Sequence, residues 1–194
     1  MKNLNFAAIF AVSLATLAGC SSSESVVAAK TFADVDAAAA AMQAKYTDAN
    51  GDLLAGVTPA AAGDITAAPN ATYTGYVGGD VGGDTLVGEL TVNADFGANT
   101  ATNTATGFFH ETDGAYAGTL TGAGVIQPTA PAGTPQISTT LTGDLTNGGS
   151  TYATDRALDG SFVENGLDPV GAMAGTADGF VDGVLMTGTF AAEN

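Results

Sequence analysis

Residues 85–96 read Thr-Leu-Val-Gly-Glu-Leu-Thr-Val-Asn-Ala-Asp-Phe, and this stretch decides the fold class. Apolar or small residues occupy every second position from Leu86 to Phe96, and polar residues fill the positions between them, with Val87 as the one apolar exception. A period of two directs alternate side chains toward a core and toward solvent, as in a half-buried antiparallel strand. Residues 137–145 repeat the pattern, so the sequence predicts a sheet built from strands of this kind.

The chain from residue 72 onward keeps this strand signature. Glycine supplies 27 of the 194 residues and tryptophan is absent, a composition that suits short strands and tight turns better than long helices. Eight strands are predicted, near residues 72–78, 85–97, 101–110, 116–122, 136–145, 157–164, 169–176 and 183–191.

A short motif recurs within these strands: a glycine, then any residue, then an apolar residue. It begins at Gly88, Gly107, Gly118, Gly143, Gly160, Gly171 and Gly188. Alternating small and large residues on one strand face suit the tight curvature inside a closed barrel, so a barrel is favoured over a sandwich in which glycines mark bulges. Because the outward faces carry Thr, Asp, Asn and Glu, the barrel is expected to be soluble rather than embedded in a membrane.

Residues 31–50 depart from the strand pattern and predict an amphipathic helix. Thr31 and Asp34 have the spacing of a capping box. An apolar stripe at helical spacing supports the helix and is formed by Phe32, Val35, Ala39, Met42 and Tyr46. Residues 51–71 predict an irregular linker, which leads into the β domain of residues 72–194.

The amino-terminal segment predicts export and lipid attachment. A basic start precedes an apolar run that ends in Leu-Ala-Gly-Cys at residues 17–20, and this run is too short for a permanent transmembrane helix. The sequence resembles the lipobox of bacterial lipoproteins, in which the chain is cut before the cysteine and the cysteine is acylated. The resemblance implies a signal peptide over residues 1–19, a lipid on Cys20 and a flexible tether over residues 20–30. An ordinary cleaved signal with an incidental cysteine is the alternative.

A lipid on Cys20 makes the membrane the first expected partner. Two or more acyl chains hold a protein stably on a membrane without a transmembrane segment. Ser21 stands where an aspartate would signal retention in the inner membrane of enteric bacteria, so the resemblance favours the outer membrane. The cell surface is the expected side, with the periplasmic face as the alternative, and the oligomeric state stays open.

Charge and composition exclude several function classes. The net charge of −16 would repel a phosphate backbone, so no nucleic acid partner is expected. His110 is the only histidine and is expected to be a surface or loop residue, so the chain is not predicted to be an enzyme and no catalytic, cofactor-binding or metal-binding residue is assigned. Calcium binding at Asp48, Asn50 and Asp52, or at residues 78–86, is a minor alternative. A glycine-rich hairpin accounts for the residue pattern of the second segment without calcium. Four aromatic residues are expected to pack in the core rather than at an interface: Phe108, Phe109, Tyr116 and Tyr152.

Two stretches resemble the transferrin-binding protein B-like surface lipoproteins, whose barrel also occurs in factor H-binding protein. Residues 88–97 are similar to the family's strand of glycine, leucine and Asp-Phe, and a threonine-rich partner strand follows. Residues 160–171 are similar to a turn between late strands, matched at Gly160, Phe162, Val170 and Gly171, although Val-Glu-Asn replaces the family's Tyr-Gly-Pro. The resemblance implies an eight-stranded antiparallel up-and-down β-barrel.

The expected function is therefore binding of an extracellular protein or solute through loops of a membrane-anchored barrel. Family members bind different ligands through divergent loops, so the resemblance implies no particular ligand. The candidate loops are residues 78–85, 111–115, 123–136, 146–156 and 164–169. A structural coat lipoprotein without a specific ligand is the alternative.

Overall fold

A computed structural model describes residues 29–131 and 133–194. The predicted signal peptide over residues 1–19 and the predicted lipidation site Cys20 lie outside the described residues, as does most of the predicted tether, residues 20–30. The described chain is mostly β, with nine strands in one antiparallel sheet and two helices. The prediction of an all-β fold is confirmed.

The strands overlap all eight predicted positions, and the largest difference is that β7 begins at residue 150 rather than 157. The bounds are β1 (Ala71–Val81), β2 (Asp84–Asp95), β3 (Thr100–His110), β4 (Gly114–Gly118), β5 (Leu120–Ile126), β6 (Ile137–Asn147), β7 (Ser150–Asn165), β8 (Asp168–Val181) and β9 (Val184–Glu193).

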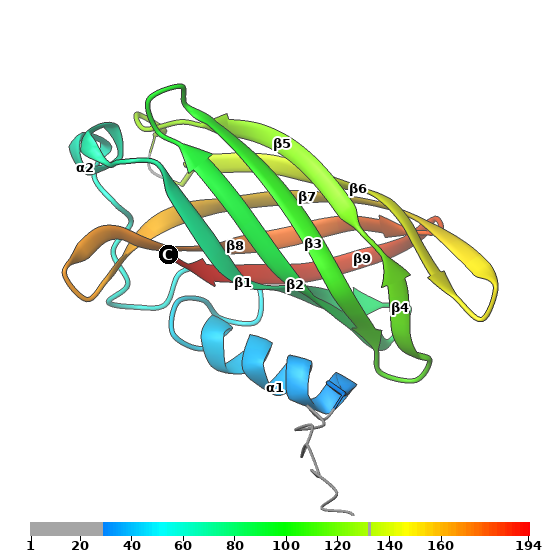
Figure 1. Cartoon of the computed structure of the whole chain (residues 1–194). Coiled ribbons are helices and arrows are strands. Elements are labelled where there is room, and N and C mark those ends of the chain that lie inside the picture. The colour runs from blue at the N-terminus through cyan, green and yellow to red at the C-terminus, as the bar shows by residue number, and fades with distance from the viewer. Residues whose placement is uncertain (1–28, 132) are drawn as a thin grey trace, which may run out of the picture.

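Strand pairing runs in a complete circuit (Figure 1). Each strand from β5 to β8 pairs with the next one along the chain, and so do β1 with β2 and β2 with β3. The pairing of β3 with β5 bridges the short β4, and the first strand, β1, also pairs with the last, β9. The described sheet therefore has a neighbour for every strand on both sides.

The predicted strand over residues 116–122 is divided, so the predicted number of eight strands is wrong. β4 and β5 lie on either side of Thr119, and both of them pair with β3 and with β6. They keep one continuous register against β6, whereas their register against β3 shifts by one residue. Gly107 accounts for the shift, because it has a φ of 61° where the register of β3 against β2 is also broken, as expected of a β-bulge.

Inward-facing side chains form the main hydrophobic core. Phe162 is fully buried, and its ring centroid lies 5.8 Å from that of Tyr73 and 5.1 Å from that of Phe96. Small residues make room for such rings: a Cβ atom on Gly88 would lie 2.5 Å from the ring of Phe108. The alternation of small and large residues in β2 thus has the packing role that the sequence predicted.

Among the described residues, Arg156 is the one charged side chain in the buried core. It lies on β7 with 0% exposure and donates hydrogen bonds to the carbonyl oxygens of Gly78 (3.4 Å) and Ala177 (3.0 Å). Its Nε and Nη1 atoms have no hydrogen-bond partner. Burial lowers the pKa of the guanidinium to about 10, although the negative charge of Asp178 opposes that shift.

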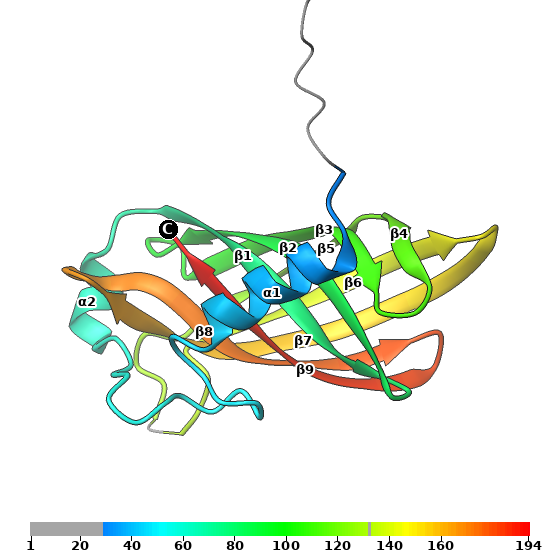
Figure 2. The same ribbon diagram turned by 90° about the horizontal axis from the view of Figure 1, so that it is seen from below.

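Helix α1 (Phe32–Gln43) packs on the outer side of the sheet (Figure 2). The predicted capping box is present, since Thr31 and Asp34 exchange side-chain and backbone hydrogen bonds. Val35 on the helix packs with Val87 of β2, which explains the one apolar residue on the solvent side of the β2 pattern. The outer face of β2 is shielded from solvent at this point because the helix covers it.

The segment after α1 differs from the prediction in two ways. The helix ends at Gln43, not at residue 50, because turns over residues 44–47 bring Tyr46 against Glu193 at the end of β9. The predicted linker, residues 51–71, contains a short helix, α2 (Ala62–Ala67). Its signal in the sequence is weak, since it has no side-chain cap, but Ile65 anchors it with 0% exposure.

Candidate ligand groove

Four of the five predicted ligand loops are tight turns, which corrects the expectation that they form a binding surface. Residues 78–85 and 146–156 are mostly strand, and only Gly82-Gly83 and Gly148-Gly149 lie between the strands. All four of these glycines have positive φ, the backbone that two-residue hairpin turns require. The predicted loops 111–115 and 164–169 likewise shrink to residues 111–113 and 166–167, and the 182–183 turn between β8 and β9 was not predicted.

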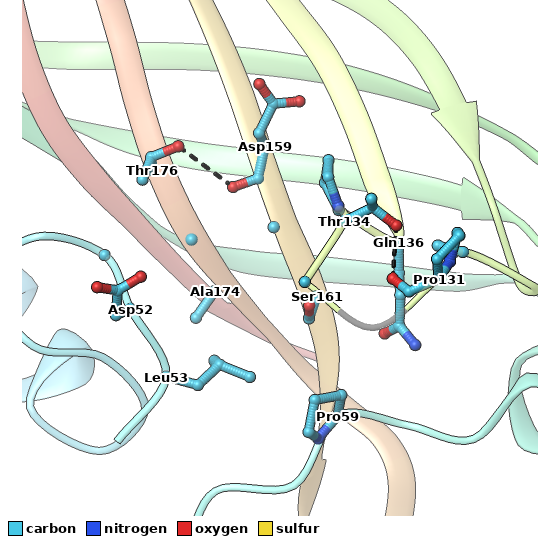
Figure 3. Close-up of a pocket in the computed structure, with 16 residues that line it drawn as sticks. Asp52, Leu53, Pro59, Pro131, Thr134, Gln136, Asp159, Ser161, Ala174 and Thr176 are labelled. Carbon is cyan, nitrogen blue, oxygen red and sulfur yellow. Dashed lines mark hydrogen bonds between the residues drawn. The ribbon is translucent and has the colours of Figure 1, made fainter. Parts of the chain in front are cut away.

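The fifth predicted loop, residues 123–136, begins within β5 and leaves residues 127–136 as a true connection. This connection and the segment from Gly51 to Pro59 stand over the outer face of β7 and β8. Between them lies a groove of about 380 Å³ (Figure 3). The groove is the feature that best fits the predicted role of the longest loop.

The first wall of the groove is the segment that follows α1. Asp48 accepts hydrogen bonds from the backbone N–H groups of Asn50 (2.8 Å) and Asp52 (3.1 Å), which fixes a turn. Gly51 lies in this turn with a φ of 84°, and a Cβ atom there would lie 2.8 Å from the methyl group of Thr176 in β8. The wall therefore approaches the sheet as closely as a glycine allows.

The carboxylate of Glu193, at the end of β9, holds this wall in place through hydrogen bonds. It accepts hydrogen bonds from Lys45 (2.8 Å) and from the hydroxyl of Tyr46 (2.5 Å). The bond from Lys45, followed by that from Tyr46, lowers the pKa of the Glu193 carboxyl. Burial, with the Glu193 bond as a second cause, raises the pKa of the Tyr46 hydroxyl. Apolar contacts of this wall with the outer sheet face complete the attachment and involve Met42, Tyr46, Leu53, Val57, Val163, Ala172, Ala174 and Ala191.

The second wall is the connection of residues 127–136. Thr134 donates both its backbone N–H (3.0 Å) and its hydroxyl (2.6 Å) to the carbonyl oxygen of Pro131. Gln136 closes the base of the connection, since its carbonyl oxygen accepts from the N–H of Gln127 at 2.7 Å. Local hydrogen bonds and prolines thus give this wall a defined shape over its described residues.

The side chain of Gln136 also connects the two walls through hydrogen bonds. Its side-chain amide donates to the carbonyl oxygen of Ala60 (2.7 Å), and its side-chain oxygen accepts from the N–H of Phe162 (3.1 Å). With 9% exposure, the side chain is buried beneath the groove rather than presented to a ligand. Nothing in the sequence pattern singled out this glutamine, because its partners are backbone atoms distant in the chain.

The lining of the groove is acidic and hydroxylated, with apolar flanks. Asp52 and Asp159 contribute carboxylates, and hydroxyls come from Thr134, Ser161 and Thr176. Apolar surface comes from Leu53, Pro59, Pro131 and Pro135. None of the described lining residues is a lysine or an arginine. Such a surface suits a ligand that donates hydrogen bonds, such as an amine or a hydroxylated compound, and disfavours an anion.

The single histidine lies elsewhere, in a cluster at the turn between β3 and β4. His110 is the last residue of β3, its side chain is 12% exposed, and its Nδ1 accepts from the backbone N–H of Asp113 (3.2 Å) in the turn that follows. Tyr116 packs against Tyr152 in a tilted arrangement, with ring centroids 5.2 Å apart, and donates to the Asp113 carboxylate (3.0 Å). Burial, followed by the Asp113 bond, raises the pKa of the Tyr116 hydroxyl.

The predicted core packing is confirmed for Phe108 and Tyr116, holds only in part for Tyr152 and is wrong for Phe109. Phe108 is fully buried and Tyr116 is 8% exposed, and both belong to the main core. Tyr152 packs against that core from a partly buried position. Phe109 faces the other way and packs with α1.

The two segments considered for calcium have other structural roles. The Asp48 carboxylate caps the turn described above, and Asp80 accepts from the N–H of Gly83 (3.1 Å) in the hairpin between β1 and β2. Within residues 29–131 and 133–194, no three His, Cys, Asp or Glu side chains converge as metal ligands. The second segment is therefore the glycine-rich hairpin that the sequence favoured.

Comparisons with protein-family models, with curated proteins and with solved structures find no match to this chain. The similarity to the transferrin-binding protein B-like lipoproteins accordingly stays a prediction from residues 88–97 and 160–171. No helix in the described part of the chain is long and apolar enough to cross a membrane.

Proposed function

We propose that this chain is a membrane-anchored surface lipoprotein whose small β-barrel binds a protein or solute ligand. The groove over β7 and β8 carries the binding part of the proposal. It combines a walled shape, hydrogen-bonding side chains and apolar flanks, which are the usual components of a ligand site. Its acidic lining further indicates that the ligand presents amine or hydroxyl groups.

The barrel itself belongs to this proposal. Eight strand positions result if β4 and β5 share one, because both lie between β3 and β6. The pairing of β1 with β9 closes the circuit. Counted in this way, the architecture is compatible with the up-and-down barrel that the family resemblance implies.

The lipid anchor is proposed from the sequence at residues 17–20. A diacylglycerol on the thiol of Cys20 and an acyl chain on its new amino terminus would hold the protein stably at the outer membrane, on the cell surface. Residues 20–28 and the start of the described chain would then separate the lipid from helix α1.

A structural coat lipoprotein is the second candidate, and one observation favours it. Four of the five predicted loops are tight turns, which leaves little variable surface for recognition at the ends of the strands. A coat would rely on the negatively charged surface alone and would need no groove.

Binding of small amines separates the two candidates. The probes are glucosamine and a short lysine-containing peptide, titrated into the full chain while the amide resonances of groove residues are followed. Asp52→Asn combined with Asp159→Asn removes both groove carboxylates, and Asp144→Asn removes an exposed carboxylate on β6 as the matched control.

Capture predicts saturable shifts centred on the groove that are lost in the double variant and kept in the control. If neither probe saturates, or if both variants lose binding equally, the groove is not a ligand site and the coat function is favoured.

A further inference from the structure

The hairpin of β8 and β9 displays a patch of apolar side chains to solvent. Phe180 and Leu185, here called the hairpin-tip patch, are 51% and 59% exposed. Phe180 and Leu185 are directly paired across the two strands, so their side chains stand next to each other on the outer face. Figure 1 places this tip at the end of the sheet away from α2.

The patch contrasts with the other apolar positions on the outer face of the sheet. Val87 is covered by α1, and Val163 and Ala191 are covered by the segment that follows α1. In the described part of the chain, Phe180 is the only aromatic residue among the exposed large apolar side chains. Clustered exposed apolar residues on an otherwise polar surface mark an interaction site.

Four exposed carboxylates surround the patch. Asp155 is the cross-strand neighbour of Phe180 on β7, and Asp178 stands two residues before Phe180 on β8. Asp182 lies in the hairpin turn, and Asp80 on β1 is paired with Thr187, two residues after Leu185. The apolar centre therefore has an acidic rim on its β7 and β1 sides and at its tip.

The described basic residues do not balance this rim, because Asp178 alone of its four carboxylates interacts with one of them, the buried Arg156. Lys30 is bonded to Glu89, and Lys45 is bonded to Glu193, both distant from the hairpin tip. Arg156 lies beneath the same strands, but it is fully buried in the core. The field at the patch is consequently negative, and a bound surface would have to supply the positive charge.

We propose that the hairpin-tip patch docks a protein that presents an apolar socket surrounded by lysine or arginine side chains. An aromatic anchor at the centre of a charged rim is a common arrangement of binding hot spots, and complementary charge fixes the orientation and raises the association rate. A second copy of this chain would meet the patch with like charge, and an anionic lipid surface would be repelled by the rim. This proposal does not depend on the groove over β7 and β8.

The test compares peptides that differ in one component of the proposed partner. The probes are an amphipathic helical peptide of leucine and lysine, oligolysine of equal charge, and the leucine–glutamate counterpart of the first peptide. They are titrated into the full chain, into Phe180→Ser combined with Leu185→Ser, and into Val125→Ser. Val125 is 48% exposed on β5 and provides the matched control for removal of an exposed apolar side chain.

The proposal predicts that the leucine–lysine peptide binds at least about tenfold more tightly than either other peptide. The double variant should lose about tenfold of that affinity, whereas Val125→Ser should keep it, and added salt should weaken binding. Circular dichroism melts of the variants establish that they are folded, which is expected because the substituted side chains are exposed.

Three results would overturn the proposal. Equal binding of oligolysine would show that charge alone acts, and equal affinity in the double variant would place binding elsewhere. The third result concerns what else the double variant loses. If it loses binding to phosphatidylcholine vesicles more strongly than it loses peptide binding, a membrane is the occupant instead. If it loses self-association more strongly than peptide binding, a second copy of the chain is the occupant.

Discussion

Replacing Arg156 by methionine should stabilise the protein, and the reason lies in the hydrogen bonds of the buried guanidinium. Only its Nη2 atom has partners, the carbonyl oxygens of Gly78 and Ala177, while Nε and Nη1 have none. A buried charge without full pairing destabilises the folded state, and an apolar side chain of similar length removes that cost. The residue therefore opposes folding at neutral pH.

The size of the effect follows from the pKa of Arg156, which burial lowers from the ordinary value of arginine to about 10. This difference corresponds to about 3 kcal/mol against the charged form in the folded state. Loss of the two hydrogen bonds offsets part of this gain, because each bond stabilises the folded state by about 1 kcal/mol. We expect Arg156→Met to raise the free energy of unfolding by about 1–2 kcal/mol at pH 7.

The sign of the pH dependence provides an independent check. Below pH 10 the guanidinium is charged in both the folded and the unfolded state, so the folded protein bears the full cost. As the pH rises above 10, the folded state loses this proton while the unfolded state still keeps it, so the cost falls. The stability difference between Arg156→Met and the parent should therefore be constant up to about pH 9 and shrink above pH 10.

Urea denaturation followed by circular dichroism measures both effects. Arg156→Ala is the control, because it removes the same charge but leaves a cavity, and its free energy of unfolding should be about 2 kcal/mol or more below that of Arg156→Met. A methionine variant that is less stable than the parent at pH 7 would contradict this prediction and would mean that the guanidinium is well paired in solution.

Three further predictions concern packing and the attachment of the outer segments. Gly88→Ala should lower the free energy of unfolding by about 1–3 kcal/mol, measured by thermal melts, because the new methyl group would overlap the ring of Phe108. Gly63→Ala in α2 is the control: its methyl group would meet no atom within 4 Å, so the variant should be neutral or stabilising. Val35→Ala should cost about 2 kcal/mol and increase hydrogen exchange in α1, while the exposed Ala37→Ser should change exchange little; equal exchange in both would contradict helix docking on β2. Glu193→Gln should lower the stability of the groove wall at neutral pH. Because the folded-state pKa of this carboxyl is lowered, the stability difference between the variant and the parent should vanish as the pH falls through that pKa. A stability difference that persists in acid would exclude the ion pair as its cause.

The strand pattern could be predicted because one face of each strand is buried and the other is not. In β2 that alternation identified the inward residues, and the exception at Val87 marked a position that α1 covers. The sequence did not indicate that the exception and the helix belonged together, because their contact spans about 50 residues of chain. The capping box at Thr31 was readable since its two residues are close in sequence.

The strand count and the loops depended on backbone conformations that composition does not specify. Gly107 resembles every other glycine in the repeated motif, yet its positive φ shifts the register of β3 and divides β4 from β5. Gly148-Gly149 suggested a flexible loop, but two positive φ values make it a tight turn between long strands. The groove arises from segments that are remote in sequence, and Gln136 connects them through backbone atoms only.

The proposed lipid on Cys20 is tested most directly by the intact mass of the protein extracted from membranes of the producing bacterium. We expect a chain that begins at Cys20 and carries added mass equal to a diacylglycerol and an acyl group. Cys20→Ser should keep residues 1–19 and gain no lipid. An unacylated chain in the parent, or the same mass shift in Cys20→Ser, would contradict this expectation.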